Sequence, residues 1–135
     1  MILKNRILCF VLAAVVWGCA AGSTSSVEKT AGAFMTAYYV KADLQEASGL
    51  ADGLALDKIK GSESLRQGLA VDAAAHQPKV RFKLVESRLG GEEAEYLYDV
   101  EFRPEKSDSV RKTVRLKVRL RDEQWKVTQF TDHDR

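Results

Sequence analysis

The feature that most restricts the fold is a change of hydrophobic period at Lys79. Before this residue apolar side chains recur every three or four positions, whereas from Lys79 onward apolar and charged side chains alternate. The first spacing is typical of helices with one apolar face, and the second of strands with one buried face. The order of the two patterns predicts an α+β domain in which helices are followed by an all-antiparallel sheet.

The alternating part predicts a four-stranded meander. In the first run Val85 breaks the alternation, which predicts a β-bulge. The second and third runs each place five apolar side chains on one face: Ala94, Tyr96, Tyr98, Val100 and Phe102, then Val110, Val114, Leu116, Val118 and Leu120. Asp122-Glu123 predicts a tight turn that sets Leu120 opposite Trp125 on the buried face.

The part before Lys79 predicts three helical stretches. The first is expected to begin at the capping-box pair Ser25 and Glu28. Its apolar face would consist of Val27, Ala31, Phe34, Tyr38 and Ala42. A second cap at Asp43 predicts a restart, and this second helix is expected to end at Gly61. A third and weaker helical stretch covers residues 62–75.

The N-terminus is built like an export signal. Residues 1–6 carry Lys4 and Arg6 without an acidic residue, and an apolar run of 15 residues extends from Ile7 to Ala21. A basic end followed by a short apolar run is typical of a secretory signal peptide. A membrane span needs roughly 20 apolar residues, so an uncleaved anchor is the less favoured alternative.

The end of this segment resembles the lipobox of bacterial lipoprotein precursors. Val16, Trp17, Gly18 and Cys19 supply the aliphatic, variable and small residues and the cysteine of that motif. The resemblance implies cleavage between Gly18 and Cys19, a diacylglycerol on the Cys19 sulfur, and an acylated amino group. It also implies export and a lipid anchor, with the periplasmic side of the outer membrane favoured in a Gram-negative cell because Ala20 follows the cysteine.

These observations divide the chain into four parts. We expect a signal peptide over 1–18, a lipidated tether over 19–26, one α+β domain over 27–131, and a tail over 132–135. The small and polar residues 20–26 would reach roughly 25 Å if extended. Because Cys9 lies in the signal peptide, the mature chain would contain no disulfide.

Charge and composition argue against several functional classes. Removing Lys4 and Arg6 leaves 19 basic and 19 acidic residues, so we expect no nucleic-acid partner. His76 and His133 are far apart in the sequence and do not form a recognisable metal-binding pattern. The sequence contains no phosphate-binding loop or cofactor motif, and no cofactor is expected.

The predicted architecture resembles the nuclear transport factor 2-like superfamily of cone-shaped, cystatin-like folds. The resemblance covers residues 26–131 and depends on Phe34 with Tyr38, on Ala42-Asp43-Leu44, and on Gln124-Trp125-Lys126-Val127. It implies N-terminal helices packed on a curved four-stranded antiparallel meander. Many members are lipoproteins of unknown function, whereas others are enzymes similar to ketosteroid isomerase or subunits that bind partners.

The third strand carries a basic stripe on its exposed face, formed by Arg111, Arg115, Lys117, Arg119 and Arg121. Arg115, Lys117 and Arg119 are the candidates for binding an anionic surface such as lipid headgroups or an envelope glycopolymer. The favoured interpretation is a cross-strand charge ladder with the acidic side chains of the preceding strand, in which each pair contributes about 0.2–1 kcal/mol.

The expected inner face carries the aromatic side chains that could line a ligand pocket. These candidates are Tyr38, Phe82, Tyr96, Tyr98 and Trp125. A role in the core is the favoured alternative. An isomerase-like site would need a carboxylate base facing a phenol. Asp43 is better explained as a helix cap, whereas an inward acid beside Tyr96 or Tyr98 would favour catalysis.

The sequence therefore predicts a membrane-anchored envelope lipoprotein that acts by binding or assembly, without catalysis. An envelope protein or an anionic glycopolymer is the expected partner. The alternative is a domain that binds a small apolar ligand, or an isomerase-like domain, using the cavity of the cone.

Overall fold

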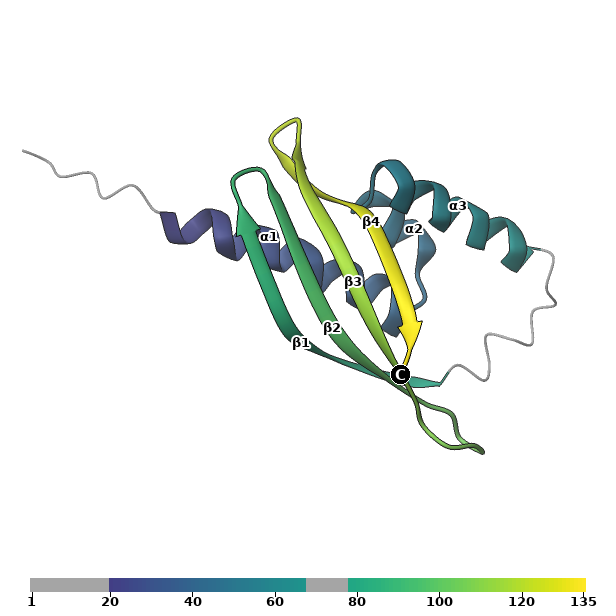
Figure 1. The fold of residues 1–135 in the computed structure, drawn as a ribbon. Helices are drawn as coiled ribbons and strands as arrows, with labels where there is room; N and C mark the ends of the chain where they lie inside the picture. Colours follow the sequence, from purple (N-terminus) through teal and green to yellow (C-terminus); the bar gives the residue numbers. More distant parts are fainter. Residues whose placement is uncertain (1–19, 68–77) are drawn as a thin grey trace, which may run out of the picture.

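The computed structural model describes residues 20–67 and 78–135, so Gly18, Cys19, His76 and the signal peptide lie outside the described residues. The helical elements are α1 (Ala20–Met35), the π-helix η1 (Thr36–Val40), α2 (Leu44–Gly49) and α3 (Gly53–Gln67). The strands are β1 (Lys79–Gly90), β2 (Glu93–Arg103), β3 (Val110–Arg121) and β4 (Gln124–Asp134). The four strands pair in sequence order, all antiparallel, and the helices cover one face of the curved sheet (Figure 1).

The register confirms the predicted alternation. In β2 every second residue from Ala94 to Val100 is buried, and in β3 Val114, Leu116 and Val118 are fully buried. The pairing of β1 with β2 shifts between Leu84 and Glu86, so Val85 occupies a bulge as expected. Asp122 and Glu123 form the tight turn, both with positive φ, and Leu120 pairs with Trp125.

A second bulge, in β4, was not predicted. Lys117 pairs with Gln129, but Val118 pairs with Val127, which leaves Thr128 without a partner in the ladder. The Thr128 hydroxyl donates instead to the Lys117 carbonyl at 3.3 Å. An inserted residue reverses the face on which the following side chains lie.

The bulge brings the C-terminal residues to the inner face. Phe130 pairs with Leu116 and Asp132 pairs with Val114, whose side chain is fully buried beneath the helices. The predicted tail over 132–135 is therefore wrong, because β4 continues to Asp134.

Helix α1 begins at Ala20, so the interpretation of residues 20–26 as an extended tether is also wrong. Once the first turns of a helix are fixed, adding a residue costs little, and Ala and Ser near its start permit this extension. The π-helix η1 then changes which side chains face the sheet. Tyr39 is buried and Tyr38 only partly so, although the regular period favoured Tyr38.

The predicted second helix is divided by one contact with the sheet. Ala51 forms a parallel bridge with Val127, and the Asp52 amide donates to the Val127 carbonyl at 2.9 Å. Helix α3 starts at Gly53 and passes through Gly61 without a break, so the expected end at Gly61 is wrong. The predicted cap at Asp43 is confirmed, because its carboxylate accepts from the Glu46 amide at 3.0 Å.

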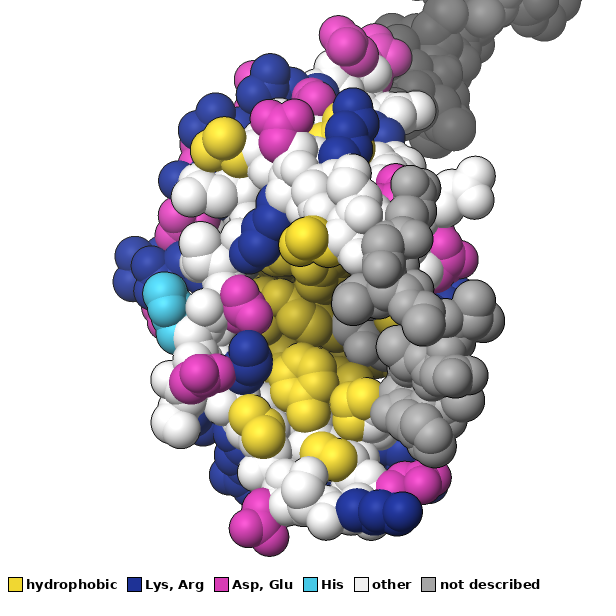
Figure 2. All heavy atoms as spheres, turned by 90° about the vertical axis from the view of Figure 1, so that its right-hand side faces the viewer, with side chains coloured by type: hydrophobic (Ala, Val, Ile, Leu, Met, Phe, Trp, Pro, Cys, Tyr) yellow, Lys and Arg dark blue, Asp and Glu magenta, His cyan; other side chains and the backbone are white. Residues whose placement is uncertain are grey.

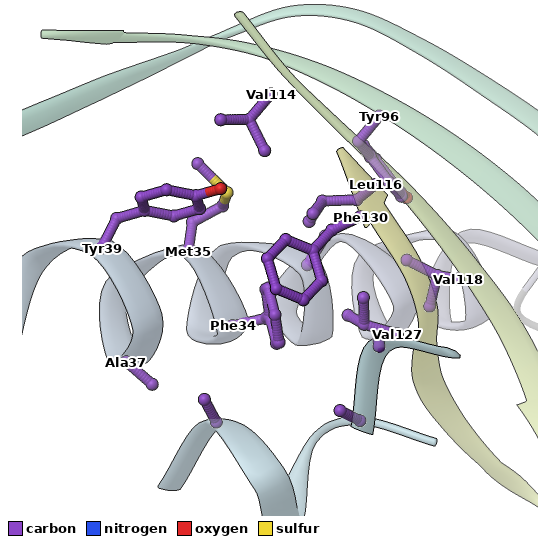
Figure 3. Packing of buried hydrophobic residues seen from close by; sticks show 14 of the residues in the cluster. Phe34, Met35, Ala37, Tyr39, Tyr96, Val114, Leu116, Val118, Val127 and Phe130 are labelled. Carbon is purple, nitrogen blue, oxygen red and sulfur yellow. The ribbon is translucent and has the colours of Figure 1, made fainter. Parts of the chain in front are cut away.

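One core lies between α1 and the sheet (Figure 3). Phe34 is fully buried and packs edge to face on Phe130, with 5.1 Å between ring centroids. Burial of such a side chain contributes about 1.5–3 kcal/mol relative to exposure. The core holds α1 against β3 and β4, while η1 contacts β1 and packs Tyr38 on Phe130 of β4, and this placement positions the tyrosines described next.

Candidate functional site

A hollow with an apolar floor opens at the end of the molecule that faces the viewer in Figure 2. At the end where α1 passes into η1, a cavity of about 250 Å³ lies between η1 and the start of β1. Its lining residues are Tyr38, Tyr39, Val40, Ala42, Pro78, Val80 and Phe102. The cavity is therefore formed by aromatic and aliphatic side chains, as is usual in sites for small ligands.

The structure brings one of the predicted pocket residues to this cavity. Tyr38 lines it, and its hydroxyl lies 3.5 Å from the Ser62 hydroxyl on α3. Tyr96 and Tyr98 are buried in the core, Phe82 packs edge to face on Tyr98, and Trp125 packs at the edge of the core.

The other six lining residues were not predicted as part of a pocket, and Tyr39 is the one among them with a buried polar group. Its side chain is 9% exposed, and among the described residues its buried hydroxyl has no hydrogen-bond partner. In Figure 3 the ring extends from η1 with its hydroxyl beside Met35. Burial, and then the Asp132 carboxylate and Tyr38, raise the pKa of Tyr39 above its ordinary range. The phenol therefore keeps its proton and can only take part as a neutral hydrogen-bonding group.

Asp132 is the carboxylate that acts on Tyr39. Its two oxygens contact separate ammonium groups, Lys58 of α3 at 3.5 Å and Lys112 of β3 at 3.5 Å. Lys112 also contacts Asp134 at 3.4 Å. Burial alone would lower the pKa of Lys112, but Asp132 and Asp134 outweigh it and raise the pKa. These four groups form a charged cluster that joins α3 to the sheet.

Lys58 also packs on the aromatic core. Its ammonium lies 4.2 Å from the centre of the Phe130 ring and donates to the Phe130 carbonyl at 3.3 Å. The sequence signal for this arrangement was the odd number of steps along the chain from Val127 to Phe130. Two apolar residues three positions apart at the end of a strand indicate a bulge, which would have placed Asp132 on the inner face.

The outer face of the sheet carries the predicted basic stripe. Lys117 contacts Glu93 at 3.8 Å and Glu95 at 3.7 Å, and Arg119 contacts Glu93 at 3.5 Å. Arg115 pairs across the ladder with Leu97, and within the described chain it forms no ion pair. The charge-ladder interpretation therefore holds for Lys117 and Arg119 but not for Arg115.

Two further observations concern residues 20–67 and 78–135 only. In these ranges no group of three His, Cys, Asp or Glu residues is arranged to hold a metal ion, and His133 lies exposed on β4. The helices of the same ranges are all too short or too polar to cross a bilayer.

The chain matches no protein-family model and no curated protein sequence. Similar solved structures do exist. A putative aromatic ring hydroxylase from Novosphingobium aromaticivorans is 12% identical, with 86% of this chain and 91% of that chain covered and a TM-score of 0.59. An NTF-2 like protein of unknown function from Shewanella oneidensis MR-1 is also 12% identical, with 83% and 98% covered and a TM-score of 0.59.

A third similar structure is a hexachlorocyclohexane dehydrochlorinase. It is 10% identical, with 84% of this chain and 86% of that chain covered and a TM-score of 0.54. Identities this low establish the fold alone. The domain has the nuclear transport factor 2-like fold, an α+β arrangement of helices on a four-stranded antiparallel meander, as the sequence predicted.

Proposed function

We propose that this chain is an exported, lipid-anchored envelope protein whose domain binds a small, largely apolar ligand in the hollow beside η1. The observation that carries the binding function is the lining of the cavity. Among the described residues, its seven lining residues include no Asp, Glu, His, Lys or Arg, and three of them are aromatic. Apolar area removed from water contributes about 25 cal/mol per Å², so such a lining favours an apolar ligand.

Tyr39 contributes its ring to the lining of this apolar site. Its hydroxyl has almost no accessible surface and lies beside Met35 in the core, so it does not face the space that a ligand would fill. The ligand is therefore expected to be held mainly by apolar contacts.

We propose that the hollow binds its ligand without catalysing a reaction on it. The carboxylate nearest the cavity phenol is that of Asp132, and each of its oxygens already contacts a lysine. A general base must be within hydrogen-bond reach of the proton that it removes. Asp132 is instead held by Lys58 and Lys112 in the charged cluster, which supports a structural role for it.

The proposed location comes from the sequence of the N-terminus. Val16-Trp17-Gly18-Cys19 supports acylation of Cys19, and two or three acyl chains hold a protein at a bilayer stably. The protein would then meet its ligand in the periplasm or at the envelope surface. An envelope protein or glycopolymer would be a second partner, bound outside the hollow.

The binding site is tested by filling the cavity. Val80 lines it and is partly buried, so Val80→Trp places an indole ring in the space that a ligand would occupy. We expect binding of Nile red, a neutral apolar probe that carries a carbonyl oxygen, to weaken about tenfold or more in the full-length chain. Fluorescence titration in a neutral detergent, at a fixed detergent concentration, measures this affinity.

Val85→Trp is the matched control, because Val85 lies on the same strand, outside the cavity, and is 53% exposed. It is expected to bind the probe as the unchanged chain does. Equal affinity of the two variants, or no binding by the unchanged chain, would refute the proposed site.

A further inference from the structure

On the outer face of the sheet, the balance of positive and negative charge differs between the two ends. Glu95 and Glu101 of β2 each lie in register between a basic side chain of β1 and one of β3. Near the hairpin turns Glu93 and Glu95 neutralise Lys117 and Arg119. At the opposite end the described residues provide no ion pair for Arg81, Lys83 or Arg111. Unpaired cations therefore gather at the end where β1 begins and β4 ends.

These cations border a depression of about 340 Å³. Four of its lining residues are the basic Arg81, Lys83, Arg111 and Arg135, and two are the acidic Asp99 and Glu101. Lys112 also borders it, but its ammonium contacts Asp132 and Asp134 on the inner face. The four cations that are free of that cluster exceed the two carboxylates by two charges.

Each of the two carboxylates has an ion-pair partner other than Arg81, Lys83 and Arg111. The Asp99 carboxylate forms an ion pair with Arg135, whose guanidinium lies 3.1 Å from it. The Glu101 carboxylate forms an ion pair with the guanidinium of Arg103, which lies outside the depression, also at 3.1 Å. The hydrogen bond from Arg103 lowers the pKa of Glu101, and Arg111 and Arg81 lower it further. The lowered pKa of Glu101 thus indicates a positive electrostatic potential at this position.

The strand register places two guanidinium groups on either side of one point. Arg81 and Arg111 both pair with Glu101, one from β1 and one from β3. Neighbouring strands are about 4.8 Å apart, so the two arginines start about 10 Å apart on the same face. Two guanidinium forks that approach from opposite sides match the tetrahedral oxygens of a phosphate better than a planar carboxylate.

We propose that this depression binds a phosphomonoester group. Arg81 and Arg111 would hold the oxygens of a phosphomonoester dianion and balance its two negative charges, and Lys83 adds a third positive charge to the depression. The site lies on the opposite face of the sheet from the hollow, so it is independent of the function proposed above. The group can belong to a soluble phosphate ester or to a lipid headgroup.

The test uses the full-length chain in a neutral detergent and two phosphomonoester probes, glycerol 3-phosphate and a short-chain phosphatidic acid. We expect both to bind, and the double variant Arg81→Gln with Arg111→Gln to weaken binding about tenfold or more. Tighter binding of the phosphatidic acid would indicate a lipid source, and equal affinities would indicate that only the phosphate is recognised. Calorimetric titration at two salt concentrations measures the affinity, which is expected to fall as salt is added.

Lys117→Gln with Arg119→Gln is the matched control, because it removes the same charge from the neutralised end of the face. Its affinity is expected to stay near that of the unchanged chain. Glu101→Gln should bind the probes more tightly, because it removes the negative charge between the two arginines. If the two double variants weaken binding equally, or if the unchanged chain binds neither probe, the proposed site is refuted.

Discussion

At the scale of single residues, the position of Tyr39 depends on η1. In a regular helix the residue four positions after Phe34 would share its face, and that residue is Tyr38. The wider turn of the π-helix places Tyr39 inward instead and leaves Tyr38 at the cavity. π-turns within helices occur frequently at functional sites, which agrees with a site beside η1.

Tyr39→Phe tests the role of this hydroxyl. The substitution removes a buried donor that lacks a partner among the described residues and keeps the ring that packs on Phe102. We expect the free energy of unfolding to rise by about 1 kcal/mol, and binding of the apolar probe to stay near that of the unchanged chain because the hydroxyl does not reach the cavity. Urea unfolding and fluorescence titration measure the two effects. A large loss of stability would show that the hydroxyl is satisfied in the free protein.

At the scale of elements, the sequence predicted the strands and the irregularities that visibly break the alternation, and missed those that depend on distant contacts. Alternation gave the four strands, the bulge at Val85 and the turn at Asp122-Glu123. The division of α2 from α3 depends on two hydrogen bonds with Val127, which is distant in sequence: the Asp52 amide donates to the Val127 carbonyl, and the Val127 amide donates to the Leu50 carbonyl. A contact between residues distant in sequence does not appear in the local spacing of apolar residues, so the helix was predicted to continue.

The candidate site was harder to predict for the same reason. Tyr38 was found because it lies on the apolar face of a helix. Tyr39 and Asp132 were missed because a π-helix and a bulge each change the face by one residue. Such irregularities leave weak signals in a single sequence, although their effect extends to every later residue of the same element.

Two glycines of α3 provide a test at this scale. Gly53 has φ +56°, a conformation that costs a residue with a Cβ about 1–2 kcal/mol, whereas Gly61 lies inside the helix with open space around it. We therefore expect Gly53→Ala to lower the free energy of unfolding by about 1 kcal/mol. Gly61→Ala should raise it by about 0.5–1 kcal/mol. Urea unfolding that gives both changes the same sign would contradict this account.

At the scale of the whole molecule, α1 connects the proposed anchor with the hollow. The helix starts at Ala20, directly after Cys19, and its 16 residues span about 24 Å before η1 begins. In Figure 1 α1 starts at one end of the domain and β1 starts toward the other, and the cavity lies between η1 and this start of β1. An acylated Cys19 would thus present the hollow on the side away from the bilayer.

The anchor itself is tested by the mass of the mature protein. We expect the native product to begin at Cys19, with a diacylglycerol on sulfur and an acylated amino group, and Cys19→Ala to keep Met1. Cys9→Ala is the control, because Cys9 lies inside the proposed signal peptide and its loss should leave processing unchanged. An intact Met1 or a free thiol in the native product would rule out lipidation.

The bulge at Thr128 has a consequence for how this chain tolerates change. From Gln129 onward, the alternation of inner and outer side chains in β4 is shifted by one residue relative to the rest of the strand. Loss of Thr128 would remove the extra residue and return β4 to a regular strand, with Phe130 still opposite Leu116 and Asp132 still opposite Val114. A one-residue deletion at this point is therefore expected to keep the packing of Phe130 and the ion pairs of Asp132, whereas the same deletion inside a regular strand would exchange its inner and outer faces.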